Sequence, residues 1–338
     1  MTRARPAIVA VAGPALAAEE AALFARRPPA GVILFARNCR DRVQLRRLVS
    51  DLRTTCGPRP LLLLVDQEGG RVQRLRPPEW RALPAMAAVG ALAARDPEAG
   101  LCAARLVGRL IAHDLAEVGI DATAAPCLDL AFPDTTEAIG DRSFGPDPEL
   151  VGRLGRALLD GLAQGAVLGV IKHMPGHGRA RLDSHHTLPV VRATAAELAR
   201  ADLRPFAACA DAPLGMTAHL VYEALDPERP ATLSPRLIRE TIRGAIGFRG
   251  LLLSDDLNMG ALAGPLPERA SAALAAGCDL VLACRGGLAE TAALLDALPP
   301  CDERLEERLA TLLDRPAPRA PLDSASAAAE LDRLLGVG

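Results

Sequence analysis

Eight short runs rich in Val, Ile and Leu are spread along the chain, separated mostly by long Ala/Leu/Arg segments of helical period. The runs occupy residues 7–13, 31–35, 61–66, 121–130, 167–174, 214–220, 250–256 and 279–284. Their hydrophobicity is continuous rather than alternating, which is typical of strands buried on both faces, as parallel strands are. Eight such β–α repeats predict an α/β fold, a single-domain (β/α)8 TIM barrel. A doubly wound open sheet is the competing architecture.

The composition is that of a globular protein with a large core. Half of the 338 residues are hydrophobic, but only 2% are aromatic, so Ala, Leu and Val must fill the interior. The formal net charge is −2 and the basic residues are scattered, which argues against nucleic acid or a membrane surface as a partner. No apolar stretch approaches the 18 or so residues of a membrane span.

No linker divides the chain, because the proline clusters at residues 27–29 and 77–78 are short. We therefore expect one domain over residues 1–338, with a C-terminal helical tail from about residue 316 to residue 338. The N-terminal run "AIVAVAG" imitates part of a signal peptide, yet an amphipathic segment follows it, and we interpret it as the first barrel strand. The eight cysteines form no CxxC pair, which favours free thiols in a reducing, cytoplasmic compartment.

Ionisable residues follow several of the apolar runs. In a parallel barrel the chemistry lies at the carboxyl ends of the strands. Here those ends read Asp66, Asp129, Lys172–His173, His219 and Asp255–Asp256. A doubly buried strand that ends in a charge needs a polar opening to solvate it. Their convergence on one rim predicts an enzyme.

Asp66 and Arg142 each allow two interpretations. Asp66 precedes Gly69 and Gly70, which permit a tight turn, so it could bind sugar hydroxyls with Arg74 nearby. It could equally cap a following helix. Arg142 lies in the turn-rich stretch "GDRSFGPDP", where a solvated surface arginine is the default. The residues alone leave both questions open.

The adjacent carboxylates Asp255 and Asp256 cannot have the same role. Successive strand residues point to opposite sides, so only one of the two can face the barrel mouth. That carboxylate could act as a nucleophile or as a metal ligand. The other is expected to cap the next helix or to bind neighbouring backbone.

The stretch "IKHMPGHGRARLDSHH" contains the only lysine of the chain, Lys172, and four of its six histidines. One hypothesis is a metal-dependent hydrolase, since His173, His177, Asp183, His185 and His186 are all ligand types. However, the spacing is not HExxH-like, and the glycines and proline break any helix that would align the ligands. The other hypothesis is acid–base chemistry, in which Asp183 orients His185 and fixes its tautomer.

Together these motifs resemble glycoside hydrolase family 3, and most closely its single-domain bacterial β-N-acetylhexosaminidases that recycle cell-wall fragments. The matching stretches are "GVILFARN", "DQEGGRVQR", "DRSFG", "IKHMPGHG" with "DSHHTLP", "MTAHLVY", "PATLSP" and "GFRGLLLSDDLNMGAL". They run in family order from about residue 7 to residue 285.

The resemblance implies a role for each matching residue. Asp255 matches the nucleophile, His185 the general acid/base and Asp183 its partner. The residues that match those holding the N-acetylglucosamine unit are Asp66, Arg74, Arg142, Lys172 and His173. No cofactor and no metal are implied.

The resemblance also implies a reaction and a substrate. A monomeric enzyme would remove non-reducing terminal β-linked N-acetylglucosamine from GlcNAc-1,6-anhydro-MurNAc peptides by double displacement, with retention. Such a step belongs to peptidoglycan recycling. A β-glucosidase or a glycoside phosphorylase of the same fold is the alternative.

Overall fold

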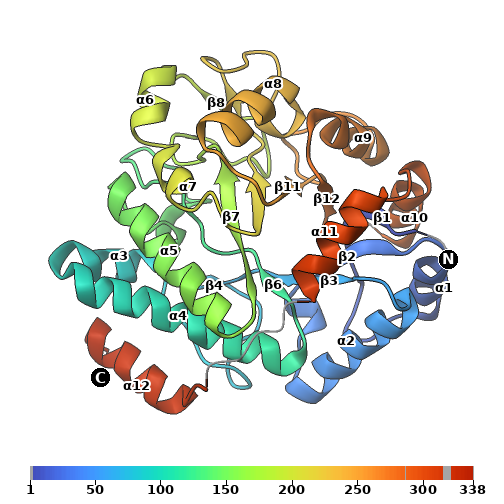
Figure 1. Ribbon diagram of the computed structural model, residues 1–338, viewed down its shortest axis with the longest axis horizontal. Helices are drawn as coiled ribbons and strands as arrows, with labels where there is room; N and C mark the ends of the chain where they lie inside the picture. The colour runs from blue at the N-terminus through green and yellow to red at the C-terminus, as the bar shows by residue number, and fades with distance from the viewer. Residues whose placement is uncertain (1–2, 286, 315–320, 338) are drawn as a thin grey trace.

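A closed barrel of eight parallel strands forms the centre of the computed structural model, which describes residues 3–285, 287–314 and 321–337 (Figure 1). In sequence order the barrel strands are β1 (Arg5–Ala10), β2 (Pro29–Leu34), β3 (Leu62–Val65), β6 (Ala122–Thr123), β7 (Leu168–Met174), β9 (Leu214–Thr217), β11 (Leu251–Asp256) and β12 (Leu280–Ala283). Each overlaps one of the eight apolar runs. β1 pairs with both β2 and β12, which closes the sheet and excludes the open alternative. The predicted single-domain TIM barrel is confirmed.

Helices surround the barrel strands (Figure 1). They are α1 (Ala18–Arg26), α2 (Arg42–Cys56), α3 (Met86–Arg95), α4 (Pro97–Val118), α5 (Pro148–Gln164), α6 (Ala195–Arg200), α7 (Arg204–Ala208), α8 (Pro235–Leu237), α9 (Leu266–Ala276), α10 (Leu288–Ala297), α11 (Glu303–Leu313) and α12 (Ser324–Leu335). The start of α5 follows from its sequence. The Asp147 side chain accepts hydrogen bonds from the first-turn amides, and Pro148 supplies the φ that a helix start needs.

Shorter elements complete the chain. Single-turn 3₁₀ helices are η1 (Ala36–Asn38), η2 (Gly140–Arg142) and η3 (Ala231–Leu233), and η4 (Ile238–Ala245) is π-helical. The strands β4 (Gln67–Gly69) and β5 (Val72–Gln73) form a small antiparallel pair, and β8 (Val190–Val191) pairs with β10 (Val221–Tyr222). Both pairs lie in the connections that follow barrel strands.

Two hydrophobic clusters explain why the strand hydrophobicity is continuous. On β1, Ile8 points into the barrel with Ile33 and Leu64, whereas Ala7 and Val9 point outward and pack against the helices. Alternate residues of a strand thus enter different clusters, and both clusters are buried. Burying a side chain of this size contributes about 1.5–3 kcal/mol relative to leaving it exposed.

Helix α11 closes the amino-terminal end of the barrel. Leu309 and Leu312 pack into the same cluster as the inward-facing strand residues, together with Cys301 just before the helix. The Cys301 amide also donates to the Ala4 carbonyl over 2.7 Å. This packing covers the amino-terminal end of the barrel, and the cavity that holds the charged strand ends opens at the carboxyl ends.

The predicted C-terminal tail contains helix α12, which packs on α3 and α4. Residues 315–320 and 338, which include part of that predicted segment, lie outside the described residues. The N-terminal apolar run forms β1 and is buried between two barrel strands. None of the helices in the described ranges combines the length and apolar character needed to cross a bilayer.

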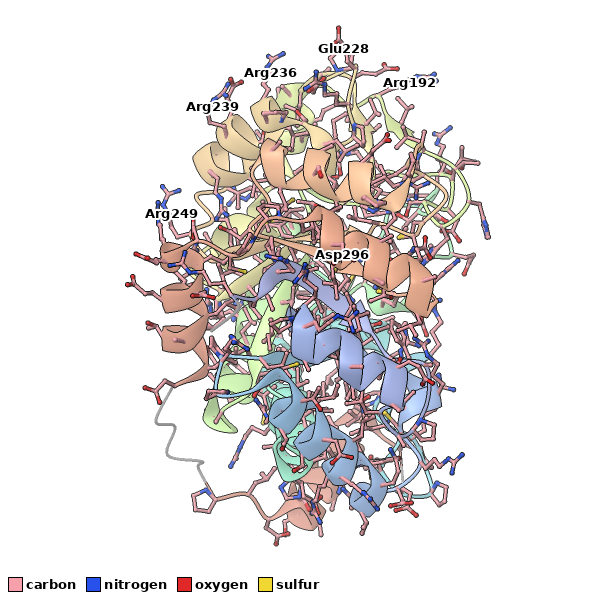
Figure 2. All side chains as sticks on the ribbon, turned by 90° about the vertical axis from the view of Figure 1, so that its right-hand side faces the viewer. Arg192, Glu228, Arg236, Arg239, Arg249 and Asp296 are labelled. Carbon is pink, nitrogen blue, oxygen red and sulfur yellow. The ribbon has the colours of Figure 1, made fainter. Side chains whose placement is uncertain are left out.

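Charged side chains cover the outside of the helical layer. Figure 2 shows Arg236, Arg239 and Arg249 pointing away from the ribbon. Arg236 and Arg239 both form ion pairs with Glu240, at 3.2 and 2.8 Å. The side chains of these two arginines and of Glu240 are more than half exposed. Exposed pairs of this kind contribute under about 1 kcal/mol, so they solvate the surface rather than hold the fold.

Candidate active site

A cavity of about 520 Å³ opens at the carboxyl ends of the barrel strands. The eight residues to which the family resemblance assigns a role all line it: Asp66, Arg74, Arg142, Lys172, His173, Asp183, His185 and Asp255. Two other charged strand ends do not reach it, since Asp129 and His219 lie behind the cavity wall. The rim is therefore polar as predicted, but two of its ionisable groups support neighbours instead of facing the opening.

The strand pair β4–β5 brings Asp66 and Arg74 together. Gly69 and Gly70 both have positive φ, 106° and 54°, and a Cβ at Gly69 would lie 2.3 Å from the Pro84 carbonyl oxygen. Only glycine fits this turn. The returning strand places the Arg74 Nη2 atom 2.9 Å from Asp66 Oδ2. Asp66 therefore does not cap a helix, and the helix-cap interpretation is wrong.

Lys172, at the end of β7, lies between two carboxylates. Its Nζ atom is 2.6 Å from Glu68 Oε1 and 3.3 Å from Asp66 Oδ1, and the lysine side chain is only 3% exposed. Burial opposes ionisation of all three groups and the two carboxylates repel each other, but Lys172 and Arg74 lower the pKa of Asp66, and Glu68 and Asp66 raise the pKa of Lys172. All three are therefore charged at neutral pH.

Arg142 holds the other side of Glu68. Its Nε and Nη2 atoms each donate to one Glu68 oxygen over 2.9 Å, a bidentate arrangement. The Arg142 side chain is 11% exposed, so the default interpretation as a surface arginine is wrong. Burial would raise the pKa of Glu68, but Arg142 and Lys172 lower it to about 2. Glu68 was not singled out from the sequence, although it follows Asp66 in "DQEGG".

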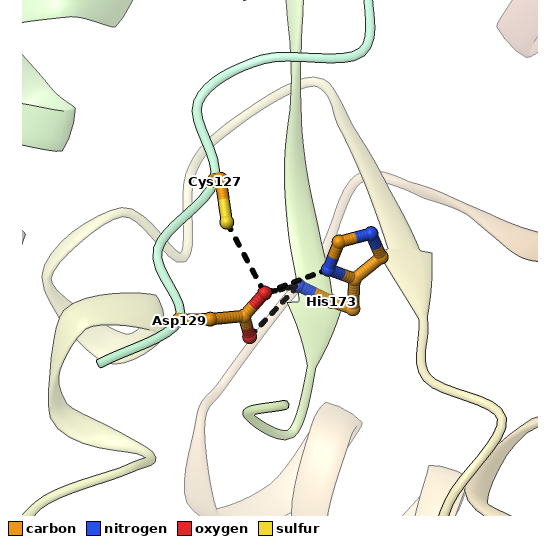
Figure 3. A group of neighbouring side chains, drawn as sticks. All are labelled: Cys127, Asp129 and His173. Carbon is orange, nitrogen blue, oxygen red and sulfur yellow. Dashed lines mark hydrogen bonds and ion pairs between the residues drawn. The ribbon is translucent and has the colours of Figure 1, made fainter. Parts of the chain in front are cut away.

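Hydrogen bonds from Cys127 and His173 converge on the Asp129 carboxylate (Figure 3). Its Oδ2 atom accepts a hydrogen bond from His173 Nδ1 over 2.6 Å and from the Cys127 thiol over 3.2 Å. Its Oδ1 atom accepts from the backbone amides of His173 and His177, at 3.2 and 2.6 Å. The carboxylate is fully buried, and although burial opposes ionisation, His173 and His177 hold its pKa well below the usual range. With Nδ1 fixed, His173 presents Nε2 to the cavity that it lines.

The group Cys127, Asp129 and His173 also has the spacing of a possible metal site. Metal binding by a cysteine requires a thiolate. Burial and the Asp129 charge raise the pKa of Cys127 well above its ordinary value, which favours a thiol that donates to Asp129. The donors therefore satisfy one another, and these residues fit a hydrogen-bonded support for His173 better than an ion.

The two adjacent carboxylates of β11 both line the cavity, so the expectation that only one of them faces the barrel mouth is wrong, but their hydrogen bonds differ. Asp256 Oδ1 accepts from the backbone amides of Asn258 and Cys284, each over 3.0 Å, so this residue binds neighbouring backbone. Among the described residues, the backbone of the next loop donates no hydrogen bond to Asp255, so this carboxylate is the candidate nucleophile. Burial opposes its ionisation, but His173, the backbone amide of Asp256 and Lys172 lower its pKa, which keeps it a carboxylate at neutral pH. An ionised, unprotonated carboxylate is what a nucleophile requires.

His219 supports this strand end without lining the cavity. Its Nδ1 atom lies 2.7 Å from Thr232 Oγ1, and its Nε2 atom lies 3.1 Å from the Asp256 carbonyl oxygen. The residue is fully buried, and burial lowers its pKa. A neutral His219 thus fixes the backbone beside Asp255.

Asp183 and His185 form a hydrogen-bonded pair on the loop after β7. Asp183 Oδ1 lies 2.6 Å from His185 Nδ1 and 2.9 Å from the His185 amide nitrogen. Burial slightly opposes ionisation of Asp183, but these hydrogen bonds and the imidazole lower its pKa. The His185 side chain is 44% exposed at the cavity. Its Nε2 atom takes no part in the hydrogen bond to Asp183.

The ligand types in this segment do not form one donor set. His173 pairs with Asp129, His177 with Ser184 over 3.1 Å, and His185 with Asp183. The geometry therefore favours the acid–base hypothesis over a cluster that uses these histidines together.

A deep cavity lined by ionised carboxylates and several cationic donors suits a sugar, whose many hydroxyls each need a partner. Together with the barrel, it defines a carbohydrate-active enzyme.

Comparisons with known proteins identify the family. The model of the glycosyl hydrolase family 3 N terminal domain matches residues 7–313. A beta-hexosaminidase of Bordetella avium is 42% identical over 89% of this chain and 87% of its own length. One from Alkalilimnicola ehrlichii is 42% identical over 92% and 89%. The crystal structure of NagZ from Neisseria gonorrhoeae with N-trifluoroacetyl-D-glucosamine is 34% identical, covers 99% of both chains and superimposes with a TM-score of 0.89. The chain belongs to glycosyl hydrolase family 3 and is a glycosidase of the β-hexosaminidase type.

Proposed function

We propose that this enzyme removes non-reducing terminal β-linked N-acetylglucosamine from GlcNAc-1,6-anhydro-MurNAc peptides by a retaining double displacement. The observation that carries the proposal is that Asp255 and the Asp183–His185 pair line one cavity together with the sugar-binding candidates. The Neisseria gonorrhoeae protein, which binds an N-acylated glucosamine analogue, supports the choice of sugar.

In the proposed complex, the hydroxyl-binding wall consists of Asp66, Arg74, Arg142, Lys172 and His173. Lys172 has three N–H groups, of which two point to Asp66 and Glu68, so the third is available to a sugar hydroxyl. Asp66 retains acceptor capacity beside Arg74 and Lys172. His173 contributes Nε2, because Asp129 already holds its other ring nitrogen.

The first step forms a covalent bond between Asp255 and the anomeric carbon. The glycosidic carbon–oxygen bond breaks as His185 Nε2 transfers its proton to the departing oxygen. The Asp183 carboxylate stabilises the charged imidazole before this transfer and fixes its orientation. In the second step neutral His185 takes a proton from water, and the resulting nucleophile displaces Asp255 from the anomeric carbon. The configuration at that carbon is retained after two inversions.

The proposed leaving group is anionic, and the cavity rim carries cations that suit it. Arg285 lines the cavity with a 61% exposed side chain. Arg37 lines it as well and is held by the carbonyl oxygens of Val11 and Cys284, at 3.1 and 3.3 Å. Carboxylates of a muropeptide would meet positive charge here.

We further propose that residues 1–338 work as one catalytic domain, a monomer in the cytoplasm, with the segment from about residue 316 as a tail. In this setting the substrate comes from the turnover of peptidoglycan, and the products return to its synthesis. These points rest on the likeness to the family.

Two measurements test the proposed function. Purified enzyme should release N-acetylglucosamine from a GlcNAc-1,6-anhydro-MurNAc peptide far faster than it releases glucose from an aryl β-glucoside. A preference for the glucoside would instead assign a β-glucosidase. A rate that depends on phosphate and yields a sugar 1-phosphate would assign a phosphorylase.

Asp255→Ala should abolish turnover, and wild-type activity in that variant would remove Asp255 from the mechanism.

A further inference from the structure

The loop of residues 175–189, between β7 and β8, carries the Asp183–His185 pair and is called the dyad loop below. We propose that His177 is a positioning residue that binds Ser184 and thereby holds this pair at the cavity. The inference deepens the proposed function, because it rests on the acid/base role proposed for His185.

The burial of three consecutive residues points to an anchor inside the dyad loop. The side chains of Asp183 and His185 are 35% and 44% exposed, whereas Ser184 between them is only 3% exposed. All three residues line the cavity, but the Ser184 side chain is buried whereas its two neighbours remain partly exposed. Its Oγ atom lies 3.1 Å from Nε2 of His177. A single buried hydrogen bond thus fixes the centre of the pair.

His177 is itself rigidly placed. It is 2% exposed, and its backbone amide donates to Asp129 Oδ1 over 2.6 Å. Its ring packs edge-on against the His173 ring, with the centroids 5.7 Å apart. The same carboxylate, Asp129, therefore fixes both the sugar-binding histidine and the base of the dyad loop.

The charge state of His177 suits a structural contact. Burial lowers its pKa to about 4, so the imidazole is neutral at neutral pH and one ring nitrogen can pair with a hydroxyl without an unpaired buried charge. The Asp129 and Asp255 carboxylates act to raise this pKa and His173 acts to lower it, and burial remains the largest effect. The His177–Ser184 contact therefore joins two neutral groups at neutral pH.

A second contact holds the dyad loop from the opposite side. The Gly260 amide, on the loop after β11, donates to the His185 carbonyl oxygen over 3.0 Å. A Cβ at Gly260 would lie 2.9 Å from the His186 carbonyl oxygen and 3.0 Å from that of His185. The pair thus lies between an internal anchor and the loop that follows the strand of Asp255.

Loss of the internal anchor should release the pair without disturbing the sugar-binding wall. Ser184→Ala removes only the hydroxyl. The loss of one hydrogen bond corresponds to roughly a five- to tenfold fall in the population of the loop conformation that holds the pair at the cavity. We therefore expect kcat for a poor alkyl leaving group to fall roughly tenfold, with KM unchanged. For an activated aryl leaving group, which needs little protonation, kcat should barely change.

Matched variants separate positioning from general damage. Thr187→Val removes a hydroxyl from an exposed residue of the same loop and should leave the kinetics unchanged. Ser184→Thr keeps the hydroxyl and should restore most of the activity. In His177→Phe the ring remains but Nε2 is lost, and combining it with Ser184→Ala should cost no more than either change alone.

Trypsin provides a measurement independent of activity. Arg181 lies in the dyad loop with a 77% exposed side chain. If Ser184 anchors the loop, cleavage after Arg181 should be several-fold faster in Ser184→Ala than in wild type or Thr187→Val. Equal cleavage rates would overturn the anchor.

The decisive comparison adds Ser184→Ala to His185→Ala. A residue that acts only through His185 has nothing left to position, so the double variant should match His185→Ala alone. A further loss, or an equal loss with poor and activated leaving groups in the single variant, would overturn the anchor while leaving the acid/base role intact. Wild-type activity in His185→Ala itself would instead overturn the acid/base role, and the anchor with it.

Discussion

The Lys172 ammonium lies 2.6 Å from the Glu68 carboxylate, and both side chains are at least 97% buried at the end of the barrel. This pair explains why a chain with 38 arginines keeps a single lysine. Arg142 already occupies the other face of Glu68 with its planar guanidinium. Between Glu68 and Asp66 lies a compact cation with three rotatable donors, a geometry that a planar guanidinium does not copy.

Replacing Lys172 by arginine should therefore weaken the enzyme severely. We expect kcat/KM for an aryl β-N-acetylglucosaminide to fall roughly a hundredfold, the effect of losing a well-placed charged hydrogen bond. Steady-state kinetics check this, with thermal unfolding to confirm that the variant is folded. Unchanged constants would mean that the lone lysine has no role in binding.

Glu68 should be important for stability, because it neutralises two buried cations. Glu68→Gln leaves Lys172 and Arg142 without their shared carboxylate and should cost about 3–5 kcal/mol of unfolding free energy at pH 7. Glu98→Gln, at an 87% exposed site, is the control and should change little. Urea unfolding of the two variants measures the difference, and equal stabilities would contradict the structural role of Glu68.

The same residue predicts a pH dependence. The pKa of Glu68 is lowered from 4.5 to about 2 in the folded protein, so its stabilising effect is present above the unfolded pKa and is lost as the pH falls toward 2. Wild type should therefore lose stability between about pH 4.5 and 2 more steeply than Glu68→Gln. Urea unfolding at several pH values in this range would show parallel curves if Glu68 were not the cause.

Asp129 should affect sugar binding although it lies behind the cavity wall. Asp129→Asn places an amide donor among the four groups that now donate to the carboxylate, which releases the His173 ring. A fall in kcat/KM of roughly 10- to 100-fold is expected from this loss. Asp134→Asn, at a 66% exposed site, is the control. Wild-type kinetics in Asp129→Asn would show that His173 needs no orienting group.

The Asp183–His185 pair should be most important when the leaving group is poor. His185→Ala is expected to lose roughly 10²- to 10⁴-fold in rate with alkyl leaving groups and much less with activated aryl leaving groups. Asp183→Asn should show the same pattern with a smaller loss, since the ring remains. A plot of rate against leaving-group pKa measures both effects. Lines parallel to that of wild type would argue against an acid role for His185.

Much of the fold could be predicted because doubly buried strands leave a local signal. The run that became β3 and the part of β7 up to Ile171 are continuously apolar in the sequence, and each lies between the barrel interior and a helix. The apolar run at 121–130 is much longer than the strand it forms, since only Ala122–Thr123 is a strand. Beyond it the chain leaves the regular sheet, and Asp129 turns to bind His173.

The eight residues assigned a role from the sequence all line the cavity, but Glu68 was missed and the pairings could not be predicted. Asp66 and Lys172 were recognisable as charges at the ends of apolar runs, yet they are 106 residues apart and their contact depends on closure of the barrel. Glu68 and Arg142 gave no local signal of their ion pair for the same reason. His177 and Ser184 are close in sequence, but only the structure shows that the serine is buried between two exposed neighbours.

Double displacement at Asp255 is the central claim, and the first-formed anomer of the product tests it most directly. Proton NMR during hydrolysis of an aryl β-N-acetylglucosaminide follows that anomer before mutarotation. Attack by Asp255 followed by water predicts that the β-anomer of N-acetylglucosamine appears first and converts slowly to the equilibrium mixture. Initial appearance of the α-anomer would contradict double displacement.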